Sequence, residues 1–284
     1  MKAVVVSFLI LLLTSVTSFA QQADTSCVCA NPVGRGLKDL GIQASAPFRI
    51  SGNDAWWVGG GVLVTGALLA TDQWVHERIN PEQYAGSAGN TYQTLTKFGS
   101  TYGLGVLAVY GGYSLVSGNH KAQETTCLAG EAFIASGIWT TLIKAIAGRQ
   151  RPSVAQVSGG RWVGPFGVSF SKHFSDFDSF PSGHTTTAFS IATVFASQYS
   201  DQPIVPILSY SLATTVGITR LMLNRHWTSD VFVGALIGYL SAREVMLNNP
   251  SELSRSRDNA QRVNVGWSLE YREGTPALSV QVAF

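Results

Sequence analysis

Charged residues are scarce in this 284-residue chain, since Asp, Glu, Lys and Arg together make up 13%, against roughly 25% in soluble domains. A net charge of +2 lacks the strong positive excess of a basic nucleic-acid-binding protein. The hydrophobic fraction of 45% excludes intrinsic disorder for the body of the chain. Three cysteines are too few for a disulfide scaffold or a zinc-finger array. What remains is a globular or membrane-embedded protein in which each charge is informative.

Residues 1–20 have the pattern of a signal peptide. Lys2 precedes an apolar stretch, and Ser18-Phe19-Ala20 supplies a small-x-small cleavage site. The apolar run is short for a transmembrane helix, which needs about 20 residues. We therefore expect cleavage after Ala20 and export of the chain. In an oxidising compartment, either Cys27 or Cys29 pairs with Cys127, or all three cysteines remain thiols.

Six segments without a charged residue predict an all-α fold, a bundle of about six core helices. They cover residues 55–71, 98–119, 132–143, 185–200, 202–219 and 231–242. Their lengths and their many Gly, Ser and Thr residues fit either buried bundle helices or transmembrane helices that pack closely.

The chain ends in a different pattern. Apolar and polar residues alternate on both sides of turn formers within residues 263–284, which predicts a short C-terminal β-hairpin. Residues 248–262 are rich in Asn, Ser and charge and are predicted to form a linker. We therefore divide the mature chain into an N-terminal extension (21–54), a helical domain (55–247), the linker and the hairpin tail.

Positive charge is concentrated at the predicted helix ends, where it needs a neutralising partner. Lys144 and Arg151 are seven residues apart, so they share a helix face if the helix persists that far. Pro152 disfavours helix at Arg151 and favours its placement in a loop. In the next motif, Ser182 and Gly183 open an apolar run, as expected of a helix N-terminus that binds an anion.

A third motif contains an imidazole and a carboxylate. His226 and Asp230 are four residues apart, so one helical turn would let the carboxylate orient the ring. Any one of the three motifs alone is better explained by loop charges, a cap or a surface pair. Together with Arg220 and His184 of the same motifs, at the ends of successive helices, they can form one pocket. That pocket would hold three cations, two histidines, one aspartate and a helix N-terminus. Such a pocket suits a tetrahedral oxyanion.

These residues resemble the type 2 phosphatidic acid phosphatase (PAP2) superfamily, which includes bacterial acid phosphatases and vanadium haloperoxidases. The family signature is K-x6-R-P, then P-S-G-H, then S-R-x5-H-x3-D. It stands here as Lys144 to Arg151-Pro152, as Pro181 to His184, and as Thr219-Arg220 to His226 to Asp230. Order and spacing match throughout, and the one departure, Thr219 for Ser, keeps the hydroxyl group.

The resemblance implies a metal-independent phosphatase with no cofactor. In it, His226 attacks phosphorus to form a phosphohistidine, Asp230 fixes its tautomer, and His184 serves as general acid and then general base. The implied phosphate-binding residues are Lys144, Arg151, Ser182, Gly183 and Arg220.

Other polar and aromatic residues receive weaker interpretations. We expect His120, His173, Asp176 and Asp178 to be polar loop residues, because they lack a metal-ligand pattern. Three residues are undecided between the rim of the site and the surface, namely Arg149, Arg225 and Trp227. Trp162, Phe166, Phe170, Phe174, Phe177 and Phe180 form either a lipid-facing lip or a loop packed on the bundle.

Three other functions stay open beside a lipid phosphatase. A soluble periplasmic acid phosphatase would act on small phosphate esters. A haloperoxidase would need vanadate, although such enzymes are typically much larger. A non-catalytic envelope protein that binds phosphorylated lipid would have little use for both histidines and the aspartate. The expected partners are a phosphorylated lipid or small phosphate ester and a membrane, with no nucleic acid.

The location is predicted to be the cell envelope, with the site in the inner membrane facing the periplasm or in the periplasm itself. Six spans with periplasmic motifs would place both termini in the cytoplasm, which conflicts with a cleaved signal peptide. Either residues 55–71 do not cross, the signal is misread, or the bundle is periplasmic. Basic residues after the last segment favour a cytoplasmic C-terminal end, and these are Arg243, Arg255, Arg257 and Arg262. We favour membrane association.

Overall fold

A computed structural model describes residues 32–46, 52–79, 86–165, 174–249, 264–272 and 275–283. The predicted signal peptide, Cys27, Cys29 and nearly all of the predicted linker lie outside these residues. Cys127 is disulfide-bonded. The division of the chain into an extension, a domain and a linker stays a prediction.

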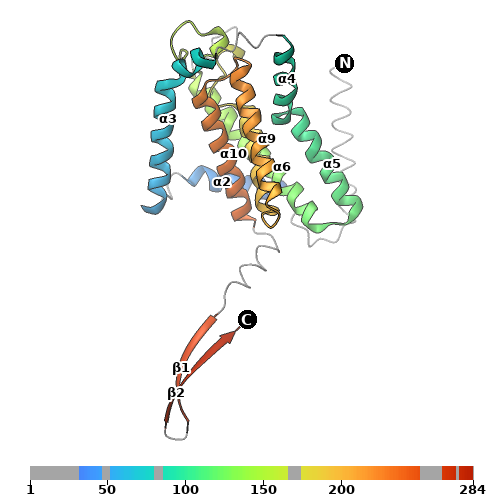
Figure 1. The fold of residues 1–284 in the computed structure, drawn as a ribbon, viewed down its shortest axis with the longest axis vertical. Coiled ribbons are helices and arrows are strands. Elements are labelled where there is room, and N and C mark those ends of the chain that lie inside the picture. Colours follow the sequence, from blue (N-terminus) through green and yellow to red (C-terminus); the bar gives the residue numbers. More distant parts are fainter. Residues whose placement is uncertain are drawn as a thin grey trace.

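The chain forms an all-α bundle, as predicted (Figure 1). Each of the six predicted segments overlaps one long helix, and the sequence did not predict the short helices α2 and α4. The described helices are α2 (Pro32–Ser45), α3 (Gly52–Ile79), α4 (Ser87–Thr96), α5 (Thr101–Ser117), α6 (His120–Ala147), α8 (Gly183–Gln198), α9 (Ile204–Met222) and α10 (Thr228–Asn248).

The ends of α6 show how local sequence places the first motif. The Asn119 side chain caps the start of the helix by accepting a hydrogen bond from the Ala122 N–H at 3.0 Å. Gly148 ends the helix in the left-handed conformation (φ 56°), which glycine adopts at little cost. Lys144 therefore lies in the last helical turn, whereas Arg151 is extended and precedes Pro152. The helix does not persist to Arg151, and the loop placement favoured by Pro152 is confirmed.

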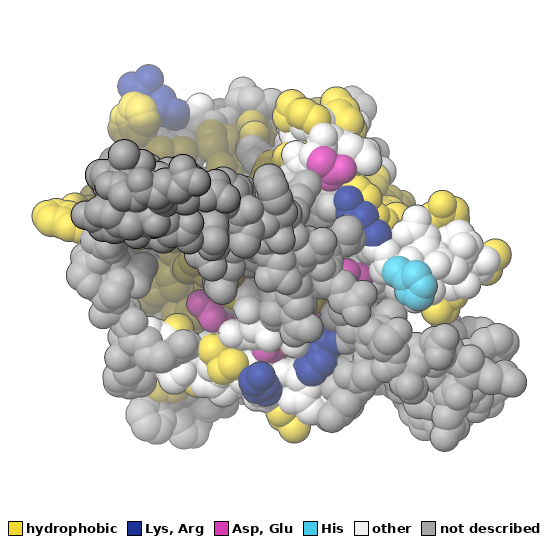
Figure 2. Space-filling view, turned by 90° about the horizontal axis from the view of Figure 1, so that it is seen from below, with side chains coloured by type: hydrophobic (Ala, Val, Ile, Leu, Met, Phe, Trp, Pro, Cys, Tyr) yellow, Lys and Arg dark blue, Asp and Glu magenta, His cyan; other side chains and the backbone are white. Residues whose placement is uncertain are grey.

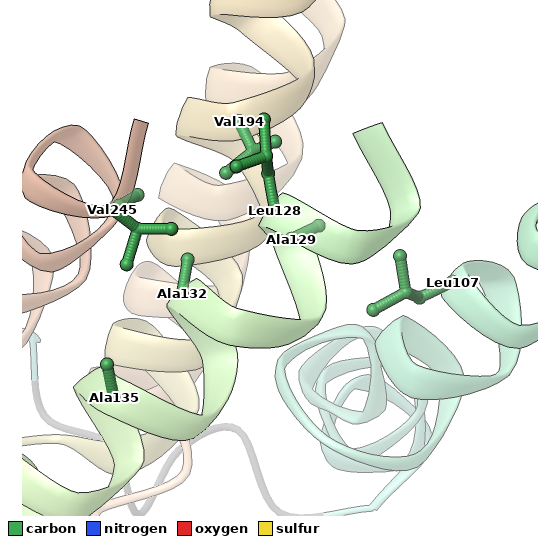
Figure 3. Packing of buried hydrophobic residues seen from close by; sticks show 8 residues of the cluster. Leu107, Leu128, Ala129, Ala132, Ala135, Val194 and Val245 are labelled. Atoms are coloured by element: carbon green, nitrogen blue, oxygen red, sulfur yellow. The ribbon is translucent and has the colours of Figure 1, made fainter. Parts of the chain in front are cut away.

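Helix α8 lies at the centre of the bundle and packs against α6, α9 and α10. Val194 of α8 meets Leu128 and Ala132 of α6 and Val245 of α10 in a fully buried cluster (Figure 3). Small residues in this core let the helices approach closely. The packing fixes the ends of these helices relative to one another, and those ends carry the three motifs.

The C-terminal β-hairpin is present as predicted. Strands β1 (Asn264–Arg272) and β2 (Thr275–Ala283) pair antiparallel, from Asn264 opposite Ala283 to Arg272 opposite Thr275. Figure 1 shows the hairpin beyond the C-terminal end of α10.

Apolar side chains are exposed on the outside of the bundle. Helix α9 exposes Ile207, Leu208 and Leu212, α5 exposes Val109 and Val116, and α3 exposes Trp56 and Trp57. Two helices, α6 and α9, are long and apolar enough to cross a membrane. Seen from the end opposite the motifs, apolar side chains also lie at the rim of the molecule (Figure 2).

Helix α2 makes polar contacts with the bundle. Its Arg35 and Asp39, one turn apart, face the bundle, where Arg35 Nη2 lies 2.8 Å from Glu131 Oε2. The Asp39 carboxylate accepts a hydrogen bond from Asn249 Nδ2 at 2.9 Å. Leu37, in contrast, is 67% exposed. Leu40 also packs against the core, and Lys38 is exposed beside Leu37, so both faces of α2 carry polar and apolar residues.

Candidate active site

The three motifs meet at one end of the bundle. Lys144 is in the last turn of α6, Gly183 begins α8, Arg220 is in the last turn of α9, and His226 precedes α10 by two residues. Because successive helices run in opposite directions, these four helix ends lie on the same side of the molecule (Figure 1).

The His226 imidazole is held by a backbone carbonyl. Its side chain is almost fully buried, and Nδ1 lies 2.7 Å from the carbonyl oxygen of Ser179. Because a carbonyl only accepts, Nδ1 carries the proton and donates it, which leaves the Nε2 lone pair available for chemistry. Asp230 Oδ2 lies 3.7 Å from Nδ1, which is too far for a hydrogen bond.

This differs from the geometry expected from sequence, in which the Asp230 carboxylate bonds the ring across one helical turn. The difference arises because α10 begins at Thr228, so His226 is not in the helix that carries Asp230. The Asp230 carboxylate is instead bound by Ser179 Oγ at 2.5 Å, Trp227 N–H at 2.8 Å and Arg149 Nη1 at 2.7 Å. Asp230 therefore supports the Ser179 segment whose carbonyl holds the imidazole.

The three predicted phosphate-binding cations come from three separate segments. Arg151 Nε pairs with Asp178 Oδ1 at 2.6 Å, and the Lys144 ammonium donates to the Asp178 carbonyl oxygen. Arg220 is buried, and its Nη1 donates to Thr96 Oγ1 at 3.1 Å, while its Nε has no partner among the described residues. Two of the cations are thus placed by the loop that contains Asp178, and the third is placed by α4.

Both histidines lie in the electric field of these cations. Burial lowers the pKa of His226 well below its usual value, and the charges of Lys144, Arg220 and Arg151 lower it further. Burial and the same three cations lower the pKa of His184, in the first turn of α8, to about 4. Since each imidazole responds to all three positive charges, the five side chains form one cluster.

Asp178 is the carboxylate that offsets part of this positive charge. Burial raises its pKa, but the hydrogen bond from Arg151 and the charge of Lys144 outweigh burial and lower the pKa overall. Asp178 is therefore ionised in the cluster, where it occupies donors that a phosphate would otherwise take. Asp178 lies in a loop, as predicted, but its ion pair with Arg151 was not predicted.

Ser182 and Gly183 lie at the start of α8. Ser182 is fully buried, its hydroxyl accepts from Thr185 Oγ1 at 2.9 Å, and its N–H donates to the Asp230 carbonyl at 3.0 Å. The Ser182 side chain does not cap its own helix. A Cβ atom added to Gly183 would lie 3.8 Å from Lys144 Cε, which brings the helix N-terminus and the lysine side by side. This end of α8 suits an anion because the helix dipole is positive there.

Arg149 was undecided from sequence, and the structure places it behind the cluster. It is 1% exposed and pairs with both Asp72 and Asp230. Its guanidinium carbon lies 4.9 Å and 5.2 Å from the ring centroids of Trp162 and Trp227. Its position two residues before Arg151 was the only available sequence signal.

The remaining interpretations have mixed outcomes. Trp227 is buried, so it is not at the surface, whereas Arg225 is exposed. His120 is also exposed, but it is the first residue of α6, so its prediction as a loop residue is wrong. Trp162 packs on the Phe180 ring, with 5.3 Å between centroids, although its own side chain is 45% exposed. Asp176 accepts the Arg151 N–H through its carbonyl oxygen. His173, Phe166, Phe170 and the Phe174 side chain lie outside the described residues.

No group of three or more His, Cys, Asp or Glu side chains suited to a metal ion occurs among the residues that the structure describes. The cluster instead brings together fixed cations and two imidazoles. Such a set of groups can bind a phosphoryl oxyanion, provide a nucleophile and move a proton.

Comparison with known proteins gives matches in the same part of the chain. Residues 125–252 match the model of the PAP2 superfamily. A lipid A 1-phosphatase of Porphyromonas gingivalis is 48% identical over 64 residues, which are 22% of this chain and 14% of the relative. A lipid A 1-phosphatase of Rhizobium johnstonii is 36% identical over 103 residues, which are 36% of this chain and 39% of the relative. The alignments thus span less than half of either relative.

A crystal structure of Aquifex aeolicus LpxE superposes with a TM-score of 0.48 and 21% sequence identity. The superposition covers 62% of this chain and 94% of that one.

Proposed function

We propose that the chain is a metal-independent phosphatase of membrane lipids, because residues 125–252 match the model of the PAP2 superfamily. It hydrolyses phosphomonoesters or diphosphates through a phosphohistidine at His226. The observation that carries this proposal is the cluster of two imidazoles and three cations, with the His226 tautomer set by Ser179 so that Nε2 is the free nitrogen.

The reaction has two steps. In the first, the Nε2 lone pair of His226 attacks phosphorus, the bond from phosphorus to the leaving oxygen breaks, and His184 gives that oxygen its proton. In the second, water attacks the phosphohistidine while His184 takes a proton from it. The nitrogen–phosphorus bond breaks, and inorganic phosphate leaves with both histidines restored.

Lys144, Arg151 and Arg220 hold the phosphoryl oxygens. Phosphoryl transfer depends mainly on positioning and on the stabilisation of negative charge, which fixed cations in a buried site provide. A metal ion is not required for that role. On binding, the substrate phosphate replaces Asp178 on part of the Arg151 and Lys144 donors. The binding of phosphate therefore includes the cost of freeing this carboxylate.

The exposed faces of the helices support a lipid as substrate. The exposed apolar residues of α9, α5 and α3 fit a bundle surrounded by acyl chains. The site at one end of the bundle would then lie near the head groups. The similar curated proteins are named for the removal of a lipid phosphate. Both observations favour a phosphorylated lipid over a small soluble ester.

The orientation of the bundle follows from charge. Arg243 lies near the end of α10 that is opposite the motifs. Positive residues favour the cytoplasmic side of a membrane. The site would accordingly face the non-cytoplasmic side.

Measurement of phosphate release tests the proposal. Purified protein in detergent should release phosphate from lipid A, phosphatidic acid and diacylglycerol pyrophosphate faster than from 4-nitrophenyl phosphate, and EDTA should leave the rates unchanged. His226→Ala should lower kcat by at least about a thousandfold, because a covalent route has no substitute nucleophile.

His120→Ala is the matched control, because His120 is exposed at the first residue of α6, at the other end of the bundle. It should keep the wild-type rate. Full activity of purified His226→Ala, or loss of activity with EDTA, would contradict the proposal.

A further inference from the structure

Asp72 is a buried carboxylate that lies outside all three motifs. It belongs to α3, follows an uncharged stretch of that helix, and has a side chain with no exposed surface. It also lies outside residues 125–252, the part that matches the superfamily model. A buried ionised carboxylate is costly unless it is paired and hydrogen-bonded. Its partners therefore indicate what it stabilises.

One set of partners belongs to the first turn of α10. Asp72 Oδ1 accepts the backbone N–H of Ser229 at 2.9 Å, and Oδ2 accepts the Ser229 hydroxyl. Ser229 is the second residue of α10, where helix N–H groups have no partner within the helix. Asp72 thus caps α10 from another helix, and its negative charge lies at the positive end of the α10 dipole.

The other partner is Arg149, all five of whose N–H donors are used. Nε and Nη2 bind the Gly159 carbonyl at 3.1 and 2.8 Å, and Nη2 also binds Asp72 Oδ2 at 2.8 Å. Nη1 binds Asp230 Oδ1 and Ser229 Oγ, both at 2.7 Å. One guanidinium therefore joins two buried carboxylates, of which Asp230 supports the Ser179 carbonyl on His226.

From these contacts we propose that Asp72 is a positioning residue for the nucleophile, acting through Arg149 and Ser229 on Asp230 and thereby on the His226 imidazole. Asp72 does not touch the phosphate. It fixes the start of α10 and the orientation of Arg149, so that Asp230 and Ser179 keep the ring aimed at phosphorus. The proposal rests on the proposed function, since it assigns a role within the same site.

Asp72 and Asp230 are negative and Arg149 is positive, so the effect of Asp72→Asn on kcat should change sign when Arg149 is replaced. Asp72→Asn keeps the shape of the side chain but turns an amide N–H₂ or a neutral oxygen toward Arg149. A displacement of a reacting group by about 1 Å can cost about a hundredfold in rate. We therefore expect kcat of Asp72→Asn to fall roughly tenfold to a hundredfold. The inhibition constant of inorganic phosphate should stay within about threefold, because Lys144, Arg151 and Arg220 are untouched.

Arg149→Met leaves two buried carboxylates, Asp72 and Asp230, without their shared cation. In that background Asp72→Asn removes one unpaired charge, so the double variant should have a higher melting temperature and a higher kcat than Arg149→Met alone. Asp72→Asn should thus lower kcat when Arg149 is present and raise kcat when Arg149 is replaced by Met. Glu77→Gln is the control on the same helix, because Glu77 is exposed and bonds Gln73 instead. It should match the wild type.

Two results would overturn the proposal. One is Asp72→Asn that is folded and has the wild-type kcat. The other is additive effects of the two substitutions on melting temperature. A wild-type protein that releases no phosphate from any of the substrates would refute the proposed function instead. The melting temperatures of the four proteins would still measure whether Asp72 and Arg149 are coupled.

Discussion

At the scale of single residues, the tautomer of His226 depends on where the backbone carbonyl of Ser179 lies. A carbonyl oxygen can only accept, so the Ser179 carbonyl at 2.7 Å keeps the proton on Nδ1 at any pH at which the ring is neutral. Asp230 contributes by bonding the Ser179 hydroxyl and by placing a negative charge 3.7 Å from Nδ1. That charge favours the positive ring formed when Nε2 is phosphorylated.

The two histidines predict an acidic pH dependence. His226 must be neutral to attack, and its lowered pKa keeps it neutral as the pH falls below the usual range for histidine. His184 must be protonated to release the leaving oxygen, and its pKa of about 4 means that this form is lost as the pH rises. We therefore expect kcat/KM to be larger at pH 5 than at pH 8.

A bound phosphate changes this balance, because its negative charge offsets the three cations that lower the pKa of His184. The alkaline limb of kcat should therefore lie at higher pH than that of kcat/KM, which reports the free enzyme. Initial rates of phosphate release between pH 4 and pH 9 measure both. A kcat/KM that rises steadily to pH 8 would contradict the assignment of His184.

The sequence predicted which residues gather in the site better than it predicted their contacts. Spacing identified Lys144, Arg151, Arg220 and both histidines because each motif lies at one helix end. It could not predict that Asp178 would bind Arg151 or that Arg149 would join Asp72 to Asp230, since these contacts link segments far apart in the chain. Asp72 offered no spacing signal because its partners are 77 and 157 residues away.

At the scale of helices, the site depends on how closely α8 and α10 pack. A Cβ atom on Gly238 would lie 2.3 Å from the Thr186 carbonyl oxygen and 2.9 Å from the Ser190 nitrogen, both in the α8 backbone. One on Gly234 would lie 2.6 Å from the Ser182 carbonyl oxygen. Only glycine permits this approach, which also holds the Ser182 N–H on the Asp230 carbonyl at 3.0 Å.

Gly238→Ala should therefore destabilise the protein and disturb the site. The methyl group meets backbone atoms that cannot turn aside, so the helices must separate, at a cost of about 1–3 kcal/mol. We expect a lower melting temperature and a lower kcat in the same detergent. Gly112→Ala is the matched control, because nothing lies within 4 Å of its added Cβ. It should be neutral or stabilising by up to about 1 kcal/mol. Equal melting temperatures for the two variants would contradict this account.

The helices that sequence did not predict are the ones with the most polar residues. Helix α4 reads as a polar segment, and α2 places Arg35 and Asp39 on its buried side. An apolar stripe is the usual sign of a packed helix, and in α2 it is limited to Val33, Leu37, Leu40 and Ala44 among Gly and polar residues. Besides the contact of Leu40 with the core, the buried contacts of α2 are an ion pair and a hydrogen bond, which composition does not reveal.

At the scale of the whole molecule, the outward faces decide between a membrane and water. Helix α9 exposes Ile207, Leu208 and Leu212, and α2 exposes Leu37 while it buries charge. Water would disfavour so many exposed apolar side chains, whereas acyl chains would solvate them. The low share of charged residues, 13% of the chain, has the same explanation.

Leu212→Asp distinguishes the two environments. Leu212 is 42% exposed and lies near the middle of α9, Ile204–Met222, so in a bilayer its side chain would meet acyl chains. A central aspartate costs roughly 2.5–3.5 kcal/mol of insertion free energy, whereas an exposed polar substitution in water usually changes stability by less than about 0.5 kcal/mol. The wild type should stay in membranes after a sodium carbonate wash, and Leu212→Asp should be depleted there. Gln156→Asp, at an exposed loop position, should behave as the wild type. Release of the wild type by carbonate, with Leu212→Asp as stable as its parent, would instead identify a water-soluble bundle.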